Sequence, residues 1–443
     1  MAHPLAAGAM VRALAGALVA LGLALPAAAQ TLLRDAGVEH ALRTLSRPVI
    51  AAAGLSPAAL RVLLIDDDAP NALVADSRTV LVSTGLLLRM DRPEMLQAVI
   101  AHEVAHLANG HLVRRMANMK TARNAALLGL AASLAVAGES PGAAAGLAAG
   151  TSSSAMRRFL GHTRAEEAAA DRAALGYLAR AGIDPGAMID VLEIFEGQEA
   201  LAPGRQDAYL RTHPLTRDRL RAARGVAAAH GAGGAADPEA AAAFERARAK
   251  LSAYLRNPAR TLRRIAGDDR SDAALVARAV AHSQAADGAA ARAAADALVA
   301  RHPDDAYAHD LRAWVLFKAR AYGEAARAYA RAAALAPDEP LIRAGHGRAL
   351  LAAGADDARA REVLESARAR DPYNPALLRD LALAQARTGD RGAAALTTAE
   401  RYALAGRLQD AAIHATRAAG LLPRGSARWQ RAQDILAAAD TGN

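Results

Sequence analysis

Apolar residues recur at intervals of three and four along residues 93–119, PEMLQAVIAHEVAHLANGHLVRRMANM. This is the spacing of a helix with one buried face. The recurring apolar positions are Met95, Leu96, Val99, Ile100, Val104, Leu107, Leu112, Val113 and Met116. We therefore expect a packed helix at the centre of the N-terminal half of the chain.

Strand-like patterns are confined to a short region before this helix. Arg61–Ile65 and Thr79–Ser83 are runs of β-favouring residues, and a turn region rich in Asp, Pro and Asn separates them. Helical patterns cover residues 32–55 and 163–181. The N-terminal half is therefore predicted to place a small sheet beside the central helix.

A tandem repeat fills the C-terminal half. Pro303 and Pro337 are 34 residues apart, and Pro372 follows 35 residues later. The residues between them fall at the small and large packing positions of tetratricopeptide repeat (TPR) helix pairs. These positions are Ala313, Leu316, Ala325, Tyr329 and Ala332 in one unit and Gly347, Leu350, Ala360, Leu364 and Ala367 in the next. The matched packing positions argue against a chance spacing of prolines, and we expect about four to five helix pairs.

Composition agrees with a mainly helical protein. Hydrophobic residues make up 53% of the 443 residues, whereas aromatic residues make up only 3%, so Ala, Leu and Val must supply most helix contacts. The length allows two or three domains. We predict an α+β, mainly α fold, with a domain containing the small β-sheet at 30–226, a Gly/Ala-rich hinge at 227–237 and an α-solenoid of TPR helix pairs at 238–440.

Residues 1–29 have the pattern of a secretory signal peptide. Arg12 precedes an apolar run from Ala13 to Leu25, and Ala-Ala-Ala precedes Gln30. The run is short for a bilayer span, which disfavours an uncleaved anchor. The chain contains no cysteine, which excludes disulfides, thiolate ligands and lipoprotein acylation. We therefore expect cleavage after Ala29 and export to the periplasm.

The formal net charge of +9 raises the question of nucleic-acid binding. The basic residues are mostly arginines dispersed through Ala-rich helices, without a basic tail or an aromatic-basic motif. Together with the export signal, this argues against nucleic acid as a partner. Peripheral contact with acidic partners or anionic membrane surfaces is compatible with the charge.

The central helix carries a candidate metal site. His102 and His106 are one turn apart in HEVAH, so their imidazoles can converge on one metal ion, and Glu103 lies beside them. Zinc suits two imidazoles and an open water position, and Glu103 can remove a proton from that water. Chance occurrence is the alternative, but a charged pair among apolar residues is costly to bury without a partner such as a metal.

The helix at 163–181 offers the third ligand. Glu167 and Asp171 are one turn apart, so Glu167 can complete the metal site while Asp171 accepts a hydrogen bond from a liganding imidazole. Glu166 is chemically equivalent but points about 100° away around the helix. On a straight helix His111 would lie far from the metal, which predicts a structural or outer role for it, and His162 is assigned to an exposed loop.

His213, in the sequence THPLT, lies beyond these helices and leaves three interpretations open. His-Pro can cap the start of a helix at 215–224. Alternatively, the imidazole can stabilise an oxyanion beside the zinc or close the fourth coordination position.

Four motifs together resemble the prenyl-protease and HtpX-like family of zinc peptidases. They are NALVADSRTVLVSTGLL, HEVAHLANGH, EAAAD followed by Arg172, and RTHPLTRDRLRAAR, and the resemblance covers about Val38 to Arg224. It implies a gluzincin-type metallopeptidase domain in which His102, His106 and Glu167 bind one Zn²⁺ per chain and Glu103 is the catalytic base. In this chain NALVADSR replaces the more usual Asn-Ala-Phe-Ala-x-Gly-Gly hairpin.

The resemblance also implies where a substrate chain is laid. The strand formed by Thr79, Val80, Leu81, Val82 and Ser83 is expected to be a sheet edge that pairs with substrate by β-addition. The Ala/Gly-rich residues 125–155 are interpreted as a mobile loop or helical flap near the site, and a buried helix is the alternative.

An export signal and TPR pairs make the chain similar to periplasmic members of this family that act on outer-membrane proteins. This resemblance implies an endopeptidase for unfolded or stalled β-barrel proteins, whose array recruits substrate or the β-barrel assembly machinery. A chaperone or adaptor that holds clients with little proteolysis is the alternative, although the intact HEVAH and EAAAD motifs favour an enzyme. An integral-membrane peptidase is disfavoured by the lack of long apolar spans.

Overall fold

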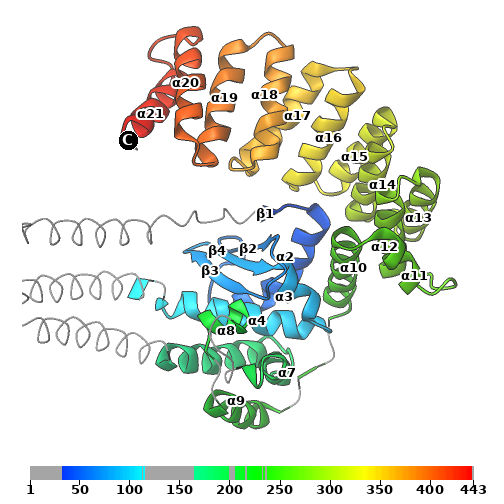
Figure 1. Cartoon of the computed structure of the whole chain (residues 1–443), viewed down its shortest axis with the longest axis vertical. Helices are drawn as coiled ribbons and strands as arrows, with labels where there is room; N and C mark the ends of the chain where they lie inside the picture. The colour runs from blue at the N-terminus through cyan, green and yellow to red at the C-terminus, as the bar shows by residue number, and fades with distance from the viewer. Residues whose placement is uncertain are drawn as a thin grey trace, which may run out of the picture.

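The computed structural model describes residues 32–111, 113–114, 164–198, 205–214, 217–231, 233–234 and 237–441. A small sheet and its helices form the N-terminal half, and a curved row of helices follows (Figure 1). This confirms the predicted α+β, mainly α fold. The predicted signal peptide, the segment 125–155 and His162 lie outside the described residues.

The sheet has four strands in the order β1-β2-β4-β3. The strands are β1 (Leu32–Leu33), β2 (Arg61–Ile65), β3 (Ala72–Asp76) and β4 (Thr79–Ser83). β2 and β4 are parallel to each other, and β1 and β3 pair antiparallel at the two edges. The strands β2 and β4 begin and end where the sequence predicted, whereas β3 occupies the region that was predicted to be a turn.

The extra strand overturns one prediction. Because β4 pairs with β2 on one side and β3 on the other, the main chain of Thr79–Ser83 is already hydrogen-bonded on both sides. The prediction that this strand is an edge for substrate is therefore wrong. The edge on this side of the sheet is β3.

Helix α4 (Pro93–Ala108) lies at the centre of the N-terminal half, as predicted, but it is enclosed on all sides. Every residue from Pro93 to His106 is buried, rather than one face only. The helix packs against α2 (Ala36–Ala52), the sheet and α7 (Gly186–Ile194). α3 (Thr84–Arg89) precedes it, while the helical residues 164–180, α8 (Ala208–Thr212) and α9 (Arg217–His230) follow.

The C-terminal half confirms the predicted α-solenoid. Five successive helix pairs run through the fully described segment 272–441. They are α12 (Asp272–Gln284) with α13 (Gly288–Arg301), α14 (Ala306–Lys318) with α15 (Tyr322–Leu335), α16 (Pro340–Ala353) with α17 (Asp357–Arg370), α18 (Pro375–Arg387) with α19 (Arg391–Leu404), and α20 (Leu408–Leu421) with α21 (Ala427–Thr441). A Cβ atom on Gly347 would lie 2.4 Å from Leu364, which explains the small residue at that packing position.

The boundary between the two halves differs from the predicted hinge. α9 continues to His230, and α10 (Pro238–Leu255) packs into the core of the N-terminal half through Phe244 and Leu251. α10 is followed by α11 (Pro258–Arg264), which leads into the first helix pair. The helix that begins the predicted repeat domain therefore also completes the core around α2.

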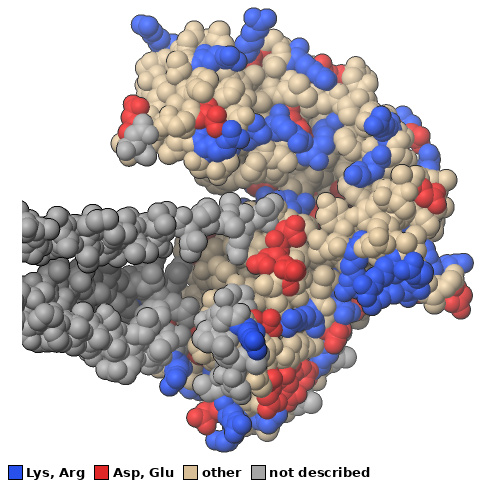
Figure 2. Space-filling view, viewed as in Figure 1, with Lys and Arg blue, Asp and Glu red and all other residues tan. Residues whose placement is uncertain are grey.

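The array of helices α12–α21 contacts α2 through charged side chains. Arg34, just before α2, lies 2.9 Å from Asp371, Arg43 pairs with Glu339, and the imidazole of His40 stacks on Tyr307. Figure 2 shows the array arching over the N-terminal half, with a hollow between the two. Within the part of the chain that the structure describes, no helix is both long and apolar enough to cross a membrane.

Candidate metal centre

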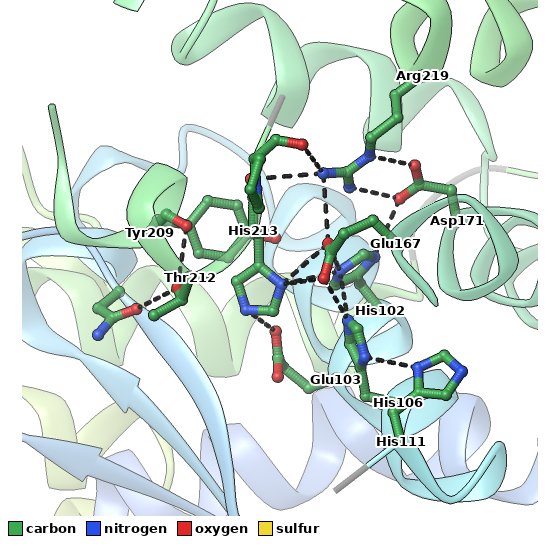
Figure 3. Close-up of polar contacts among 12 residues, drawn as sticks. His102, Glu103, His106, His111, Glu167, Asp171, Tyr209, Thr212, His213 and Arg219 are labelled. Atoms are coloured by element: carbon green, nitrogen blue, oxygen red, sulfur yellow. Dashed lines mark hydrogen bonds and ion pairs between the residues drawn. The ribbon is translucent and has the colours of Figure 1, made fainter. Parts of the chain in front are cut away.

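Four buried side chains converge beside the N-terminal half's central helix. His102 and His106 come from α4, Glu167 comes from residues 164–180, and His213 follows α8 (Figure 3). One ligand atom from each lies within 4.8 Å of all the others. Residues distant in the sequence therefore meet at one point.

The separations fit the donor set of a tetrahedral metal ion. Nε2 of His102 lies 3.0 Å from Nε2 of His106 and 3.1 Å from Oε2 of Glu167. Nδ1 of His213 lies 3.3 Å from Nε2 of His102 and 3.1 Å from Oε2 of Glu167. Ligands bound to zinc at about 2.0–2.1 Å lie roughly 3.4 Å apart at the corners of a tetrahedron. Imidazole nitrogens and one carboxylate are ligands that zinc takes readily.

The two neighbouring glutamates occupy different surroundings. Glu167 is 0% exposed and faces the cluster, whereas Glu166 is 9% exposed and its Oε1 atom lies 3.6 Å from Arg114. Helical rotation separates the two carboxylates, as the sequence indicated. The structure therefore places Glu167, rather than Glu166, among the candidate ligands.

The outward nitrogen of each α4 histidine has its own partner. Nδ1 of His102 lies 3.0 Å from Asp171, the residue predicted for this contact. Nδ1 of His106 lies 2.8 Å from Nδ1 of His111. α4 ends at Ala108, and Gly110 has φ +66°, so the chain turns back and brings His111 under His106. The straight helix assumed from the sequence is wrong here, and His111 contacts a candidate ligand.

Glu103 lies beside the cluster without joining it. Its side chain is 1% exposed, and its Oε1 atom lies 3.3 Å from Nε2 of His213. His213 thus faces the candidate metal position with one nitrogen and Glu103 with the other. The main-chain N–H of His213, which caps the C-terminal end of α8, donates to the Tyr209 carbonyl 2.8 Å away.

Burial and neighbouring charges separate the protonation states of the cluster. Burial alone would lower the pKa of His102, but its hydrogen bonds to Asp171 and Glu167 raise that pKa to about 9. Burial lowers the pKa of His106 to about 3 despite the nearby Glu167. Burial opposes ionisation of Glu167, yet His213, His102 and His106 hold its pKa well below the usual range. Glu167 is thus ionised and His106 neutral, the forms in which each binds a cation, whereas His102 would have to lose a proton on binding a metal.

Sequence reasoning missed Arg219. This residue of α9 forms a bidentate ion pair with Asp171 at 2.6 and 2.8 Å and lies 3.3 Å from Glu167. It stands six residues after His213 in the motif RTHPLTRDRLRAAR, so the motif contained the signal. The sequence alone did not show that this arginine is buried or which carboxylates it contacts, so nothing distinguished it from the other arginines of the motif.

The start of the edge strand β3 lies close to the segment that carries His213. The N–H of Tyr209 donates to the Pro70 carbonyl at 3.0 Å, and the Thr212 hydroxyl lies 3.5 Å from the Asn71 side chain. Ala72, the first residue of β3, follows directly. A chain paired with β3 would therefore run past the cluster.

Comparison with known proteins agrees with this geometry. Residues 37–227 match the model of Peptidase family M48. The chain is 34% identical over 134 residues to the β-barrel assembly-enhancing protease of Escherichia coli (strain K12). The aligned residues make up 30% of this chain and 27% of that protein. It is 32% identical over 139 residues to a putative β-barrel assembly-enhancing protease of Vibrio cholerae, 31% of this chain and 28% of that protein. The match thus spans only about a quarter of these relatives.

Two solved structures resemble the chain weakly. "MamA MSR-1 C2" has a TM-score of 0.32 at 16% identity and covers 37% of this chain and 93% of that one. The Cut9–Hcn1 hetero-tetramer of APC/C has a TM-score of 0.33 at 14% identity and covers 78% of this chain and 64% of that one. The likeness is confined to the N-terminal half: residues 37–227 match the Peptidase family M48 model, and the chain is similar over 134 residues to a β-barrel assembly-enhancing protease.

Proposed function

We propose that the chain is a zinc-dependent endopeptidase. The observation that carries this proposal is the buried cluster of His102, His106, Glu167 and His213 with Glu103 beside it. His102, His106 and Glu167 would hold one zinc ion per chain, and Asp171 orients His102 from behind. A bound zinc would supply Lewis acidity, lowering the pKa of a water and polarising the scissile carbonyl.

Glu103 acts as the general base in this proposal. Its carboxylate lies next to the cluster on α4, where it can accept a proton from the attacking water. The same carboxyl group then gives that proton to the leaving amine nitrogen. Burial of the site excludes bulk water, so the proton stays with the reacting groups.

His213 holds the site at rest. Its Nδ1 atom faces the three proposed ligands, and its Nε2 atom lies 3.3 Å from the carboxylate of Glu103. One imidazole would therefore take the fourth ligand position of a bound zinc while it contacts the base. This geometry supports the fourth-ligand interpretation.

The strand β3 receives the substrate. Among the described residues, no strand pairs with its outer edge, and it starts at the segment that contacts α8. An extended polypeptide can add to such an edge through main-chain hydrogen bonds. Unfolded β-barrel strands present the complementary unpaired main chain, which fits the activity named for the homologous proteases.

The array of helices α12–α21 selects which proteins are brought to the metal site. Its stacked pairs arch over the N-terminal half, so a chain held there is at high local concentration near the cluster (Figure 2). We place the protein in the periplasm, with unfolded or stalled outer-membrane proteins as substrates and the β-barrel assembly machinery as a partner. Residues 1–29 carry the export signal for that location.

One experiment tests the proposal. The purified full chain is incubated with an unfolded outer-membrane β-barrel, with and without a zinc chelator, and fragments are followed by mass spectrometry. We expect fragments only without chelator and none with Glu103→Gln. Binding of the barrel without fragments from zinc-loaded wild type would instead support the chaperone or adaptor function.

A further inference from the structure

The guanidinium group of Arg219 lies behind the cluster and reaches several of its parts at once. Its side chain is almost fully buried, at 5% exposure. Nε and Nη2 bind the two oxygens of Asp171, at 2.6 and 2.8 Å. Nη1 donates to the Pro214 carbonyl at 2.8 Å and lies 3.3 Å from Oε2 of Glu167.

One branch of these contacts leads to His102. A bidentate arginine fixes both the position and the plane of a carboxylate. Asp171 held in this way presents its Oδ1 atom to Nδ1 of His102, 3.0 Å away. The orientation of the His102 ring, and so the direction of its Nε2 atom, depends on this chain of contacts.

The other branch leads to His213. The same Nη1 atom that reaches Glu167 also lies 3.4 Å from the carbonyl oxygen of His213 and binds that of Pro214. The backbone that carries His213 is thereby tied to the carboxylate that faces its imidazole. A lysine at this position could not make the planar fork on Asp171 and the carbonyl contact together.

The positive charge of Arg219 also offsets the negative charges of two buried carboxylates. Glu167 and Asp171 are buried carboxylates on the same helix, one turn apart. Burial of two carboxylates without a cation is strongly unfavourable. Arg219 places one positive charge against both carboxylates, through its pair with Asp171 and its 3.3 Å approach to Glu167.

We propose that Arg219 is a positioning residue of the metal centre, which orients His102 through Asp171 and holds the His213 backbone against Glu167. This inference rests on the proposed metal site. Arg219 is not one of the four side chains that form the candidate metal site. It acts on His102 through Asp171 and contacts Glu167 and the His213 backbone directly, so it links two of the three proposed ligands to the resting imidazole.

The test compares Arg219→Gln and Arg219→Lys with Arg221→Gln. Arg221 lies on the same helix, but it is largely exposed and pairs only with the exposed Asp218. Metal affinity is measured by chelator competition, and coordination is followed by the visible absorption of the cobalt(II)-loaded protein. We expect both Arg219 variants to lose roughly ten- to a hundredfold in affinity, as substitutions behind metal ligands do. Arg221→Gln should match wild type.

Double variants separate the two branches. If Arg219 acts through Asp171, Arg219→Gln should add no further loss of affinity to Asp171→Asn. If it also holds His213, the cobalt spectrum of Arg219→Gln should shift toward that of His213→Ala and should not change further in the double variant. A general loss of structure would not reproduce the His213→Ala spectrum.

The outcomes are distinct. Wild-type affinity and an unchanged cobalt spectrum in a folded Arg219→Gln would overturn this inference alone. A wild-type chain that binds no metal would overturn the proposed function and this inference with it. If Arg219→Gln does not melt cooperatively, Arg219→Lys and Asp171→Asn carry the comparison, because both retain more of the buried polar contacts.

Discussion

Oε1 of Glu103 lies 3.3 Å from Nε2 of His213. Substituting His213 with alanine removes an imidazole that contacts both the proposed base and the proposed fourth ligand position. We expect basal cleavage of an unstructured peptide to rise, by up to roughly tenfold if the open state is populated about one tenth of the time. Zinc should be retained. A fall in cleavage with zinc retained would instead assign His213 to the oxyanion.

Glu103→Gln tests the base itself. The amide keeps the shape of the side chain but is too weakly basic to take the proton of the attacking water. Cleavage should therefore fall by at least about a hundredfold. Zinc content, measured by elemental analysis of the purified protein, should match wild type because Glu103 is outside the ligand set. Turnover at the wild-type rate would rule out the mechanism.

The two adjacent glutamates provide a matched pair. Glu167→Ala should lose most bound zinc, because this carboxylate lies 3.1 Å from His102 and faces the cluster. Glu166→Ala should keep zinc, because that side chain is directed toward Arg114. Metal analysis of both variants decides the assignment, and the reverse result would move the third ligand to Glu166.

These predictions show what the sequence could and could not provide. The i, i+4 spacing of HEVAH and of Glu167 with Asp171 is local, so helical periodicity alone indicated which side chains share a face. The contact between His111 and His106 depends on the left-handed φ of Gly110, which breaks the helix that the apolar pattern seemed to continue. Local periodicity could not reveal that break.

The sheet edge was missed for a related reason. Ala72–Asp76 is short, carries few β-branched residues and lies between turn-forming residues, so its pairing with β4 was not visible in the sequence. Once β3 is added, β4 becomes an interior strand. Arg219 likewise became recognisable only when α9 and the helical residues 164–180 were placed together.

Phe244→Ala tests how firmly the repeat array is built into the N-terminal half. Phe244 belongs to α10, yet it is 1% exposed in the core that contains α2 and α4. Its loss should cost about 3–5 kcal/mol of stability. Hydrogen exchange should therefore accelerate in α4, whereas Phe317→Ala, within α14, should accelerate exchange in the array and leave α4 protected. Equal protection of α4 in both variants would contradict the shared core.

Mild acid should loosen the contact between α2 and the array. Burial lowers the pKa of His40 to about 4, from 6.5 for an unperturbed histidine, so between these values the unfolded chain binds more protons. The stability that His40 contributes is present above pH 6.5 and is lost as the pH falls toward 4. His40→Phe keeps an aromatic ring for Tyr307 but does not titrate.

The measurement is the melting temperature of both proteins between about pH 7.5 and about pH 4.5, which covers most of the window of this titration. The melting temperature of the wild type should fall more than that of His40→Phe on acidification. The difference between the two melting temperatures should be smallest at neutral pH. Parallel curves over the whole range would show that His40 does not govern the acid response.

The outer edge of β3, which no described strand pairs and where we propose that substrate binds, has a consequence for selectivity. An edge strand recognises N–H and C=O groups, which every polypeptide carries, so recognition there is largely blind to residue identity. Proline is the exception, because it has no N–H to donate. A finished barrel has each of its strands hydrogen-bonded to two neighbours and so has none to offer. Discrimination at this edge would therefore be between incomplete and complete pairing, so a client would escape cleavage by closing its own barrel.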